Sequence, residues 1–281
     1  MKISVIGTGT IGSAITEALL NAGNKVLVYN RTASKTEPLV NLGAIAVSTP
    51  EQAIEESDVT ILAVYGGEIL REVLLNDNVK PLLKGKKLLT VATSKAEEIK
   101  AISNEVSLLG GSLVELAIMS GAVDVKAKQG YALLGCEKSQ ELFWKEVMEA
   151  IGEVVYTGEV GSAAIAATPS IIGEALRSLH LAYSVAFAMK INLPQELIKR
   201  DFSMLMPGSE KMVSALFNRD YSQGMATLEG YRDTIEIAYK DLKSVGLPTE
   251  IFENILALYD KAGELGFADK AETSLMEALL D

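Results

Sequence analysis

Short apolar runs alternate with helix-like segments through residues 1–158, and no other feature of the sequence constrains the fold as strongly. The stretches between the runs, such as IGSAITEALLNAG before Asn24, have the apolar spacing expected of helices. Parallel strands need long crossovers, which helices supply, so this alternation predicts an α/β domain with a mainly parallel sheet. The strand-like segments are residues 2–7, 25–30, 44–47, 59–64, 86–93, 112–119, 130–136 and 152–158.

The character of the sequence changes after Gly158. From Gly161 to about Ile191 almost every residue suits a helix, and Pro169 is the only breaker. A helix of roughly 30 residues would be about 45 Å long, which exceeds most helices within one domain. The rest of the chain contains three or four further helical segments and no convincing strand. We predict a second, all-α domain over residues 159–281 that begins with a long interdomain helix.

The composition argues against several classes of protein. The 281 residues are 48% hydrophobic, enough for a sizeable core, and no window approaches the ~18 apolar residues of a membrane helix. A net charge of −11 disfavours a nucleic-acid partner, because binding phosphates requires a basic face. The single histidine, His180, and the single cysteine, Cys136, leave no metal-ligand pattern and no internal disulfide. We expect a cytoplasmic protein without a metal, a membrane segment or a signal peptide.

The glycine-rich segment GTGTIG, residues 7–12, follows the first predicted strand and opens the first predicted helix. In a dinucleotide-binding turn the glycines have separate tasks: a tight turn, close approach of the pyrophosphate, and close packing of helix on strand. The start of the helix adds free N–H groups and the positive end of the helix dipole. We therefore predict a Rossmann-like cofactor site formed by Gly7, Thr8, Gly9, Thr10, Ile11 and Gly12.

The residues after the second predicted strand indicate which dinucleotide binds. A site for NAD usually has a carboxylate about 20 residues after the glycines, where it binds the ribose 2′-hydroxyl. Here that position is Asn30, and it is followed by Arg31, Thr32 and Lys35. A carboxylate would repel a 2′-phosphate, whereas a guanidinium can bind one through two hydrogen bonds. We predict NADP(H) as the cofactor; the alternative is that these residues form an exposed basic loop.

Three segments, GTGTIG, VYNRTASKTEPLVNLGA and ESDVTILAV, resemble the β-hydroxyacid dehydrogenase superfamily, and most of all its imine reductase branch. The similarity continues in GEVGSAA (158–164), MATLEGYRD (225–233) and LYDKAGELGFADKAETS (258–274), so it covers nearly the whole chain. The resemblance implies an oxidoreductase with a small-molecule substrate and a cofactor domain similar to that of 6-phosphogluconate dehydrogenase. It also implies that Val64, Tyr65 and Thr93 lie along the cofactor.

The segment ELAIMSG, residues 115–121, favours the imine reductase branch. Imine reductases typically have Asp-Gly-Ala-Ile-Met here, which is similar to Glu-Leu-Ala-Ile-Met in this chain, whereas hydroxyacid dehydrogenases usually have Pro-Val-Ser-Gly-Gly. In the hydroxyacid group, N–H groups at this point bind the substrate carboxylate, and Ser120 and Gly121 could do the same. Equally, these two residues could cap the next helix.

The departures from the family pattern concern the proton donor. Six residues after Gly161, hydroxyacid dehydrogenases have a catalytic lysine and many imine reductases an aspartate or tyrosine, but this chain has Ala167. Ser170-Ile171 replaces an asparagine pair, and Val91 replaces the Asn or Asp that ends the fifth strand. Reduction of a carbonyl needs an added proton, whereas an iminium ion already carries its proton. The sequence therefore predicts reduction of C=N bonds, with Ser170 near the substrate.

Glu174 is a candidate for the missing catalytic group. In helical projection it lies about 20° from Ala167, so it could hold an iminium ion or act as an acid. Alternatively, Glu174 pairs on the surface with Arg177 at position i+3. His180 projects away from this face, and we interpret it as a structural or interface residue.

Arg232 is the second catalytic candidate, because hydroxyacid relatives have a lysine beside the cofactor and substrate at the corresponding position. The alternative is a salt bridge of Arg232 with Asp233 or Glu236.

Two other functions stay open: a hydroxyacid or semialdehyde dehydrogenase with a non-standard proton donor, and an NADP-binding protein with little turnover. The long helix is apolar on several faces, and the remaining ~90 residues cannot cover it alone. We therefore expect a homodimer with interlocked second domains.

Overall fold

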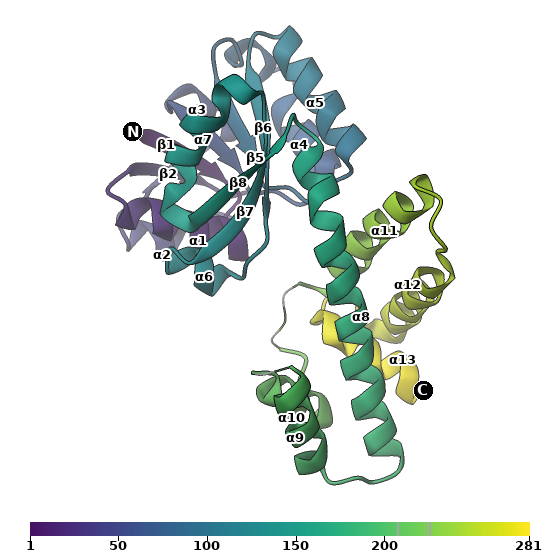
Figure 1. Cartoon of the computed structure of the whole chain (residues 1–281). Helices are drawn as coiled ribbons and strands as arrows, with labels where there is room; N and C mark the ends of the chain where they lie inside the picture. Colours follow the sequence, from purple (N-terminus) through teal and green to yellow (C-terminus); the bar gives the residue numbers. More distant parts are fainter. Residues whose placement is uncertain (207, 223, 225) are drawn as a thin grey trace. The chain divides into compact units, whose positions relative to one another are not determined.

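The computed structural model describes residues 1–206, 208–222, 224 and 226–281, which form two compact units, Met1–Ala167 and Thr168–Asp281 (Figure 1). Met225, the first residue of the segment MATLEGYRD, lies outside the described residues. The division between the units falls inside helix α8 (Ser162–Lys190). The domain boundary expected at residue 158 lies just before this helix, and it stays a prediction.

The first unit contains one sheet of eight strands in the order β3-β2-β1-β4-β5-β6-β7-β8. Every neighbouring pair is parallel except β6 and β7, which confirms the predicted α/β fold with a mainly parallel sheet. Each strand lies within a segment that the sequence marks as strand-like. The strands are β1 (Lys2–Ile6), β2 (Lys25–Tyr29), β3 (Ile45–Ala46), β4 (Val59–Leu62), β5 (Lys87–Thr90), β6 (Ser112–Ile118), β7 (Gly130–Gly135) and β8 (Gly152–Gly158).

Helices cover both faces of this sheet, and the apolar side chains of β1 alternate between them. Val5 packs with Ile15 of α1 on one face, whereas Ile6 packs with Leu70 of α4 on the other. Strands buried on both faces explain why the strand segments are continuously apolar rather than alternating. The helices are α1 (Thr10–Asn21), α2 (Glu37–Val40), α3 (Pro50–Glu55), α4 (Gly66–Leu74), α5 (Ala96–Leu108), α6 (Ala122–Lys126) and α7 (Glu141–Met148).

Strands β6 and β7 are antiparallel because the chain between them is short. Residues 119–129 join them and include only the helix α6, whereas a parallel pair needs a crossover of about a dozen residues or more. The hydroxyl of Ser120 accepts a hydrogen bond from the backbone N–H of Tyr131 at 2.7 Å, which fixes the connection.

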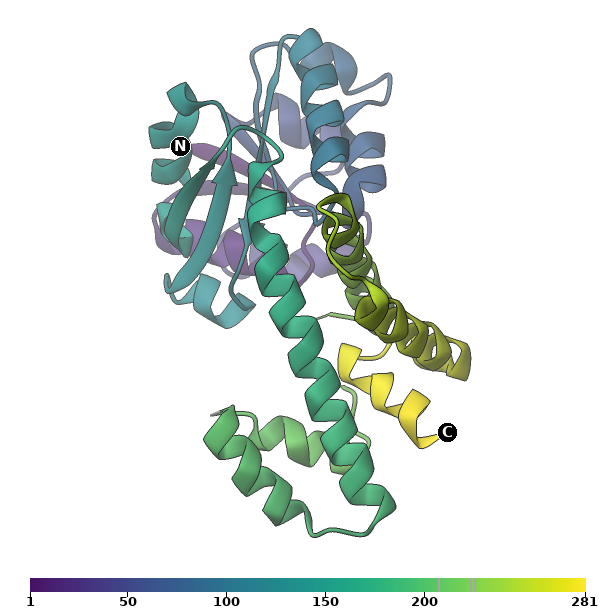
Figure 2. The ribbon, with the colours of Figure 1, turned by 45° about the vertical axis from the view of Figure 1, so that its right-hand side comes forward.

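The second unit is helical, as predicted, but five α-helices follow α8 in the described residues rather than the three or four expected. Helix α8 has 29 residues, about 44 Å at 1.5 Å per residue, and continues through Pro169 as one element. Its core brings together Val185 of α8, Phe202 of α9, Ile235 of α11 and Tyr259 of α12. Figure 2 shows α9 and α10 side by side. The helices after α8 are α9 (Gln195–Leu205), α10 (Glu210–Phe217), α11 (Leu228–Ser244), α12 (Glu250–Ala262) and α13 (Met276–Leu280).

Within the described residues, no helix combines the length and the apolar character that crossing a membrane requires.

Candidate functional site

The strand order places the glycine-rich segment at a topological switch point. The chain proceeds from β1 to β2 on one side of the sheet, and from β4 to β5 on the other. In open α/β sheets, ligands bind outside the carboxyl ends of the strands at such a point. Gly7 follows β1 directly, and its N–H donates to the carbonyl of Tyr29 at 2.8 Å. The motif and the topology therefore indicate the same edge of the sheet.

Gly7 and Gly12 are required by the packing of the protein itself. Gly7 has a φ of +98°, and a Cβ there would lie 2.2 Å from the carbonyl oxygen of Ala63. A Cβ on Gly12 would lie 2.0 Å from the carbonyl oxygen of Gly7 and 2.9 Å from the Cβ of Ala63. These positions have the two structural tasks that the pattern predicts, a tight turn and close packing of helix on strand.

Gly9 is different, because the fold leaves space around it. A Cβ on Gly9 would meet no protein atom within 4 Å, and its φ of −72° suits any residue. Gly9 is the N-cap of α1, which has no side-chain cap hydrogen bond and no acidic residue in its first turn. The protein's own packing gives no reason for glycine here, whereas a pyrophosphate close to the backbone would. The turn, with exposed Thr10 and half-buried Ile11 beside it, therefore fits a dinucleotide phosphate.

Asn30 connects this turn to the loop after β2. Its side-chain oxygen accepts a hydrogen bond from the N–H of Thr8 at 3.1 Å, and its amide nitrogen donates to the carbonyl of Thr32 at 3.1 Å. The hydroxyl of Thr8 donates to the carbonyl of Lys35 at 3.2 Å. The structure thus brings together residues of two segments that the sequence identified separately.

Arg31 and Lys35 supply positive charge beside the turn. Both side chains are exposed, and neither has an ion-pair partner among the residues that the structure describes. Thr32 is also exposed and precedes the short 3-10 helix η1 (Ala33–Thr36). Two cations without a counter-charge, with a neutral Asn30 in place of a carboxylate, fit an additional phosphate group.

The ends of β4 and β5 contribute the other cofactor candidates to the same edge. Val64 is half-buried, and Tyr65, which is 59% exposed, is the N-cap of α4. Thr93 lies in the exposed loop after β5. Ala63 donates its N–H to the carbonyl of Ile6 at 2.8 Å, which holds the end of β4 against the start of the glycine turn.

Sequence reasoning missed three residues that support this edge. A Cβ on Gly67 would lie 2.5 Å from the hydroxyl of Ser94, and that hydroxyl donates to the carboxylate of Glu98. Gly67 therefore allows α4 to lie close to the start of α5, and so fixes the loops that carry Tyr65 and Thr93. The pair Gly66-Gly67 after β4 is the one feature of the local sequence that could have indicated this close approach. The contact itself joins Gly67 to Ser94, which is distant in the sequence.

The position of the usual proton donor is occupied by a buried methyl group. Ala167 is 7% exposed and forms a small apolar cluster with Leu133 and Ala163, against which Met119 packs. Val91, at the end of β5, is another apolar residue, and it packs against the main core of the sheet. Both positions therefore lack a group that could donate a proton.

Glu115, in the segment ELAIMSG, is another residue that the sequence did not single out. It is 3% exposed and accepts a hydrogen bond from the N–H of Ala163 at 2.8 Å, so it caps the start of α8. Burial raises the pKa of the Glu115 carboxyl, while the hydrogen bonds from the start of α8 and the charge of Lys100 act in the opposite direction. The role that this geometry supports is anchoring of α8.

The two catalytic candidates of the second unit are engaged in ion pairs. The carboxylate of Glu174 accepts a hydrogen bond from Nε of Arg177 at 3.0 Å, which is the surface pair considered as the alternative. Arg232 donates from Nε to Asp260 at 2.9 Å and is bound by the carboxylate of Glu236 as well. Neither pair tests a role in turnover, so both catalytic assignments stay predictions.

The candidate substrate residues have structural partners or lie exposed. Gly121 is the N-cap of the short helix α6, which has no side-chain cap hydrogen bond, and the hydroxyl of Ser120 accepts a hydrogen bond from the N–H of Tyr131 at the start of β7. The substrate-binding assignment of both residues stays a prediction. Ser170 is exposed on α8. His180 is exposed and stacks on Phe202 at 4.9 Å between ring centroids.

Comparison with known proteins agrees with this arrangement. The family model of the NAD binding domain of 6-phosphogluconate dehydrogenase matches residues 2–161. The Arabidopsis thaliana protein described as probable 3-hydroxyisobutyrate dehydrogenase-like 1, mitochondrial, is 24% identical over 284 residues, covering 99% of this chain and 85% of that protein.

Two solved structures share the fold over nearly the whole chain. The 3-hydroxyisobutyrate dehydrogenase of Salmonella typhimurium has a TM-score of 0.88 at 16% identity and covers 99% of each chain. The imine reductase of Myxococcus stipitatus in complex with NADP+ has a TM-score of 0.69 at 21% identity, covering 99% of this chain and 100% of that one. Because the matched cofactor domain makes up more than half of the sequence, the chain belongs to the β-hydroxyacid dehydrogenase superfamily and is an NAD(P)-dependent oxidoreductase.

Proposed function

We propose that this protein is an NADPH-dependent reductase of C=N bonds in imines or iminium ions. The observation that carries the proposal is the burial of Ala167 among Leu133 and Ala163. Hydroxyacid dehydrogenases resembled by this chain have a lysine at this position, and the apolar surroundings here offer no substitute from neighbouring side chains of the cluster. The chemistry must therefore suit a substrate that needs no proton from this point.

Imine reduction meets this condition. Reduction of a carbonyl leaves an alkoxide that must be protonated, and a positioned acid contributes about 10²–10⁴-fold to that rate. An iminium ion already carries its proton, and the bound cofactor supplies a hydride that converts it to a neutral amine. The residues of this chain then need only to orient the substrate and to provide a negative potential for the cation.

The preference for NADPH is part of the proposal. The exposed side chains of Arg31, Thr32 and Lys35 would hold the 2′-phosphate, and the open backbone at Gly9 would hold the pyrophosphate. The absence of an ion-pair partner for Arg31 and Lys35 within the described residues supports this role. So does Asn30, since a carboxylate at its position would repel the phosphate.

The test is consumption of NADPH with a cyclic imine, an aldehyde, a ketone and a keto acid across a range of pH. We expect turnover of the imine to exceed that of the ketone by about 100-fold, the typical contribution of a general acid. Equal rates for ketone and imine would contradict the argument from Ala167.

Glu174 is the proposed holder of the cationic substrate. We expect Glu174→Gln to raise the KM of an iminium substrate about tenfold through loss of a charged partner. Glu196→Gln is a matched control, because Glu196 forms a comparable i+3 pair with Lys199 at 3.0 Å. If the kinetics of Glu174→Gln equal those of the control, Glu174 does not belong to the site.

A second candidate is a hydroxyacid or semialdehyde dehydrogenase with another proton donor. The description of the Arabidopsis relative as probable 3-hydroxyisobutyrate dehydrogenase-like favours it. In that case carboxylate substrates are turned over, and Arg232→Ala raises their KM. Tight NADPH binding without oxidation across the whole panel would instead identify an NADP-binding protein with little turnover.

We also propose that two copies of the chain associate through α8. Leu176, Tyr183 and Phe187 are 38%, 51% and 62% exposed, and their spacing of seven and four residues puts them on one face of the helix. Phe187→Glu should shift the molar mass measured by light scattering from dimer to monomer. Leu108→Glu, which changes a leucine that is 87% exposed on α5, should leave it unchanged.

A further inference from the structure

A pocket lies at the edge of the sheet opposite the glycine-rich turn. Lys87 and Ser112 are the first residues of β5 and β6, so the pocket opens at the amino ends of these strands. The glycine turn, in contrast, follows the carboxyl end of β1. The pocket has a volume of about 330 Å³, and small-molecule sites begin at about 300 Å³.

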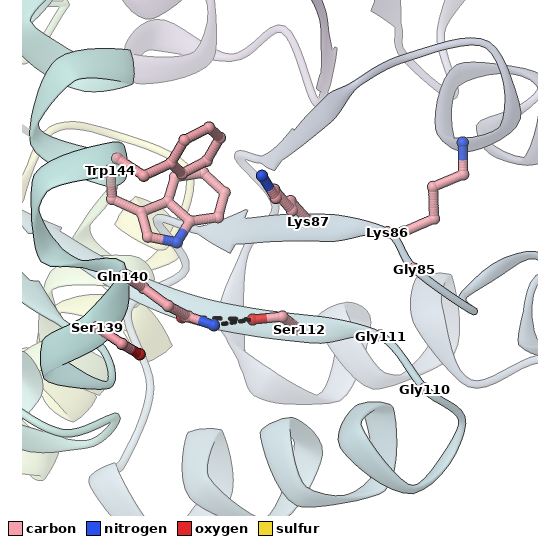
Figure 3. Close-up of a pocket in the computed structure, with 10 residues that line it drawn as sticks. Gly85, Lys86, Lys87, Gly110, Gly111, Ser112, Ser139, Gln140 and Trp144 are labelled. Carbon is pink, nitrogen blue, oxygen red and sulfur yellow. Dashed lines mark hydrogen bonds between the residues drawn. The ribbon is translucent and has the colours of Figure 1, made fainter.

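Trp144 of α7 forms one wall of this pocket. The residue is 1% exposed, yet its indole N–H has no hydrogen-bond acceptor among the residues that the structure describes. Figure 3 shows the indole nitrogen directed toward the side of the pocket that carries Gln140 and Ser112. The indole nitrogen is not among the fully buried, unpaired polar atoms of the described residues, so it is accessible from the pocket. An oxygen atom of a ligand in the pocket could therefore accept its N–H.

Two other side chains around the pocket can donate hydrogen bonds, those of Lys87 and Gln140. The ammonium of Lys87 lies 3.9 Å from the centroid of the Phe143 ring, which holds the cation at the wall without neutralising its charge. The amide nitrogen of Gln140 donates to the hydroxyl of Ser112 at 3.0 Å and keeps a second N–H for a ligand. Acceptor atoms on a ligand would complement these donors.

The positive charge around the pocket also favours a ligand with acceptor atoms. In a chain of net charge −11, the lining includes two lysines, and no carboxylate is among the described lining residues. Lys86 donates to the carbonyls of Glu55 at 2.7 Å and Ser57 at 3.3 Å, and Figure 3 shows it directed away from Trp144. Lys87 therefore remains the cation available to a ligand.

Backbone hydrogen bonds hold one side of the pocket. The N–H of Gly85 donates to the carbonyl of Gly110 at 2.8 Å, and the N–H of Ser112 donates to the carbonyl of Lys86 at 2.9 Å. Gly85 has a φ of +76°, a left-handed backbone conformation that favours glycine. These bonds join the segments that precede β5 and β6.

We propose that this pocket binds a small molecule with a carboxylate or phosphate group, whose oxygens accept hydrogen bonds from the indole N–H of Trp144 and the ammonium of Lys87. Trp144 is the only tryptophan of the chain, so its fluorescence reports on this pocket alone. The probes are cyclohexanecarboxylate and inorganic phosphate, which distinguish the two anion types, and cyclohexanemethanol is the neutral control. We expect a saturable change in emission with at least one anion and none with the alcohol.

Lys87→Gln should weaken binding of that anion about tenfold, as expected for loss of a charged hydrogen bond. Lys25→Gln is the matched control: Lys25 is exposed and is the first residue of β2, at the same edge but separated from β5 by β1 and β4. The control should bind like the unchanged protein, and both variants should still bind NADPH. Full titrations are repeated with saturating NADP+ present.

Any one of several results would overturn the proposal. They are the absence of a saturable response to both anions, an equal response to the alcohol, and unchanged binding by Lys87→Gln. Loss of the response in saturating NADP+ would also overturn it, since the anion would then occupy the cofactor turn. This test does not depend on which substrate the enzyme reduces.

Discussion

The side-chain oxygen of Asn30 accepts a hydrogen bond from the backbone N–H of Thr8 at 3.1 Å. The same side chain donates from its amide nitrogen to the carbonyl of Thr32, also at 3.1 Å. One neutral residue thus holds the glycine turn and the basic loop together. An aspartate could keep the first bond, but it would lose the second and add a negative charge next to Arg31.

Asn30→Asp should therefore change the cofactor preference. We expect the Kd for NADPH to rise about tenfold or more, through loss of one hydrogen bond and repulsion of the 2′-phosphate. The Kd for NADH should change much less, because it lacks that phosphate. Fluorescence titration with both cofactors measures the ratio, and an equal change for NADPH and NADH would mean that Asn30 acts only on the turn.

Arg31→Ala tests the basic loop directly. Removal of a guanidinium from a phosphate should weaken NADPH binding about ten- to hundredfold and leave NADH binding unchanged. Arg71→Ala is the control, because Arg71 is paired with Glu105 at 2.7 Å on the surface of the same unit. The assignment of Arg31 to the 2′-phosphate is wrong if the two variants bind NADPH equally well.

Gly9→Ala and Gly12→Ala should separate cofactor binding from folding. The methyl group added at Gly9 would enter open space, so the free energy of unfolding should change by less than about 0.5 kcal/mol while NADPH binding weakens. At Gly12 a Cβ would lie 2.0 Å from the carbonyl oxygen of Gly7, and such crowding costs about 1–3 kcal/mol. Urea unfolding and NADPH titration of both variants measure the two effects. If Gly9→Ala binds NADPH as tightly as the unchanged protein, the pyrophosphate does not bind at this turn.

The buried carboxyl of Glu115 should make stability depend on pH. Burial raises its pKa, so the folded state holds the proton more tightly than the unfolded state does. This contribution to stability is fully present below the ordinary carboxyl pKa of about 4.3 and is lost as the pH rises through the raised value. Glu115→Gln removes the titration and keeps an acceptor for the N–H of Ala163.

The free energy of unfolding of Glu115→Gln, relative to the unchanged protein, should accordingly increase with pH above that ordinary value. A difference of one pKa unit between the folded and unfolded states changes the free energy of unfolding by about 1.4 kcal/mol. Urea unfolding of both proteins at several pH values measures the difference. A constant difference across the range would show that the pKa of Glu115 is the same in the folded and unfolded chain.

Cys136 should be unreactive in the folded protein. Its side chain is fully buried, and burial with the negative charges of Glu141 and Glu137 raises its pKa to about 11. The thiolate is the reactive form, so a thiol reagent near neutral pH should modify Cys136 only after unfolding in urea. Rapid modification of Cys136 in the native protein would show that the chain directly after β7 opens readily to the reagent.

The strands could be predicted from the sequence because each is a short apolar run that ends at a glycine or a polar residue. The glycine turn was also recognisable, since Gly7, Gly9 and Gly12 have fixed spacing directly after a strand. The pairing of Glu174 with Arg177 was among the alternatives, because an i+3 contact on a helix is local. These features depend on residues that are close in the chain.

The sequence did not reveal contacts between distant segments. Nothing local indicates that β6 and β7 are antiparallel, that Glu115 caps α8, or that Asp260 binds Arg232 from another helix. The sequence predicted separate tasks for the glycines, but only the structure showed that Gly12 is crowded by protein atoms and that Gly9 is not. The sequence by itself determined the elements and the cofactor turn, because hydrophobic periodicity and backbone freedom are local properties. Only the tertiary structure decided which charges are paired and which remain available to a ligand, because burial and charge pairing depend on which distant segments meet.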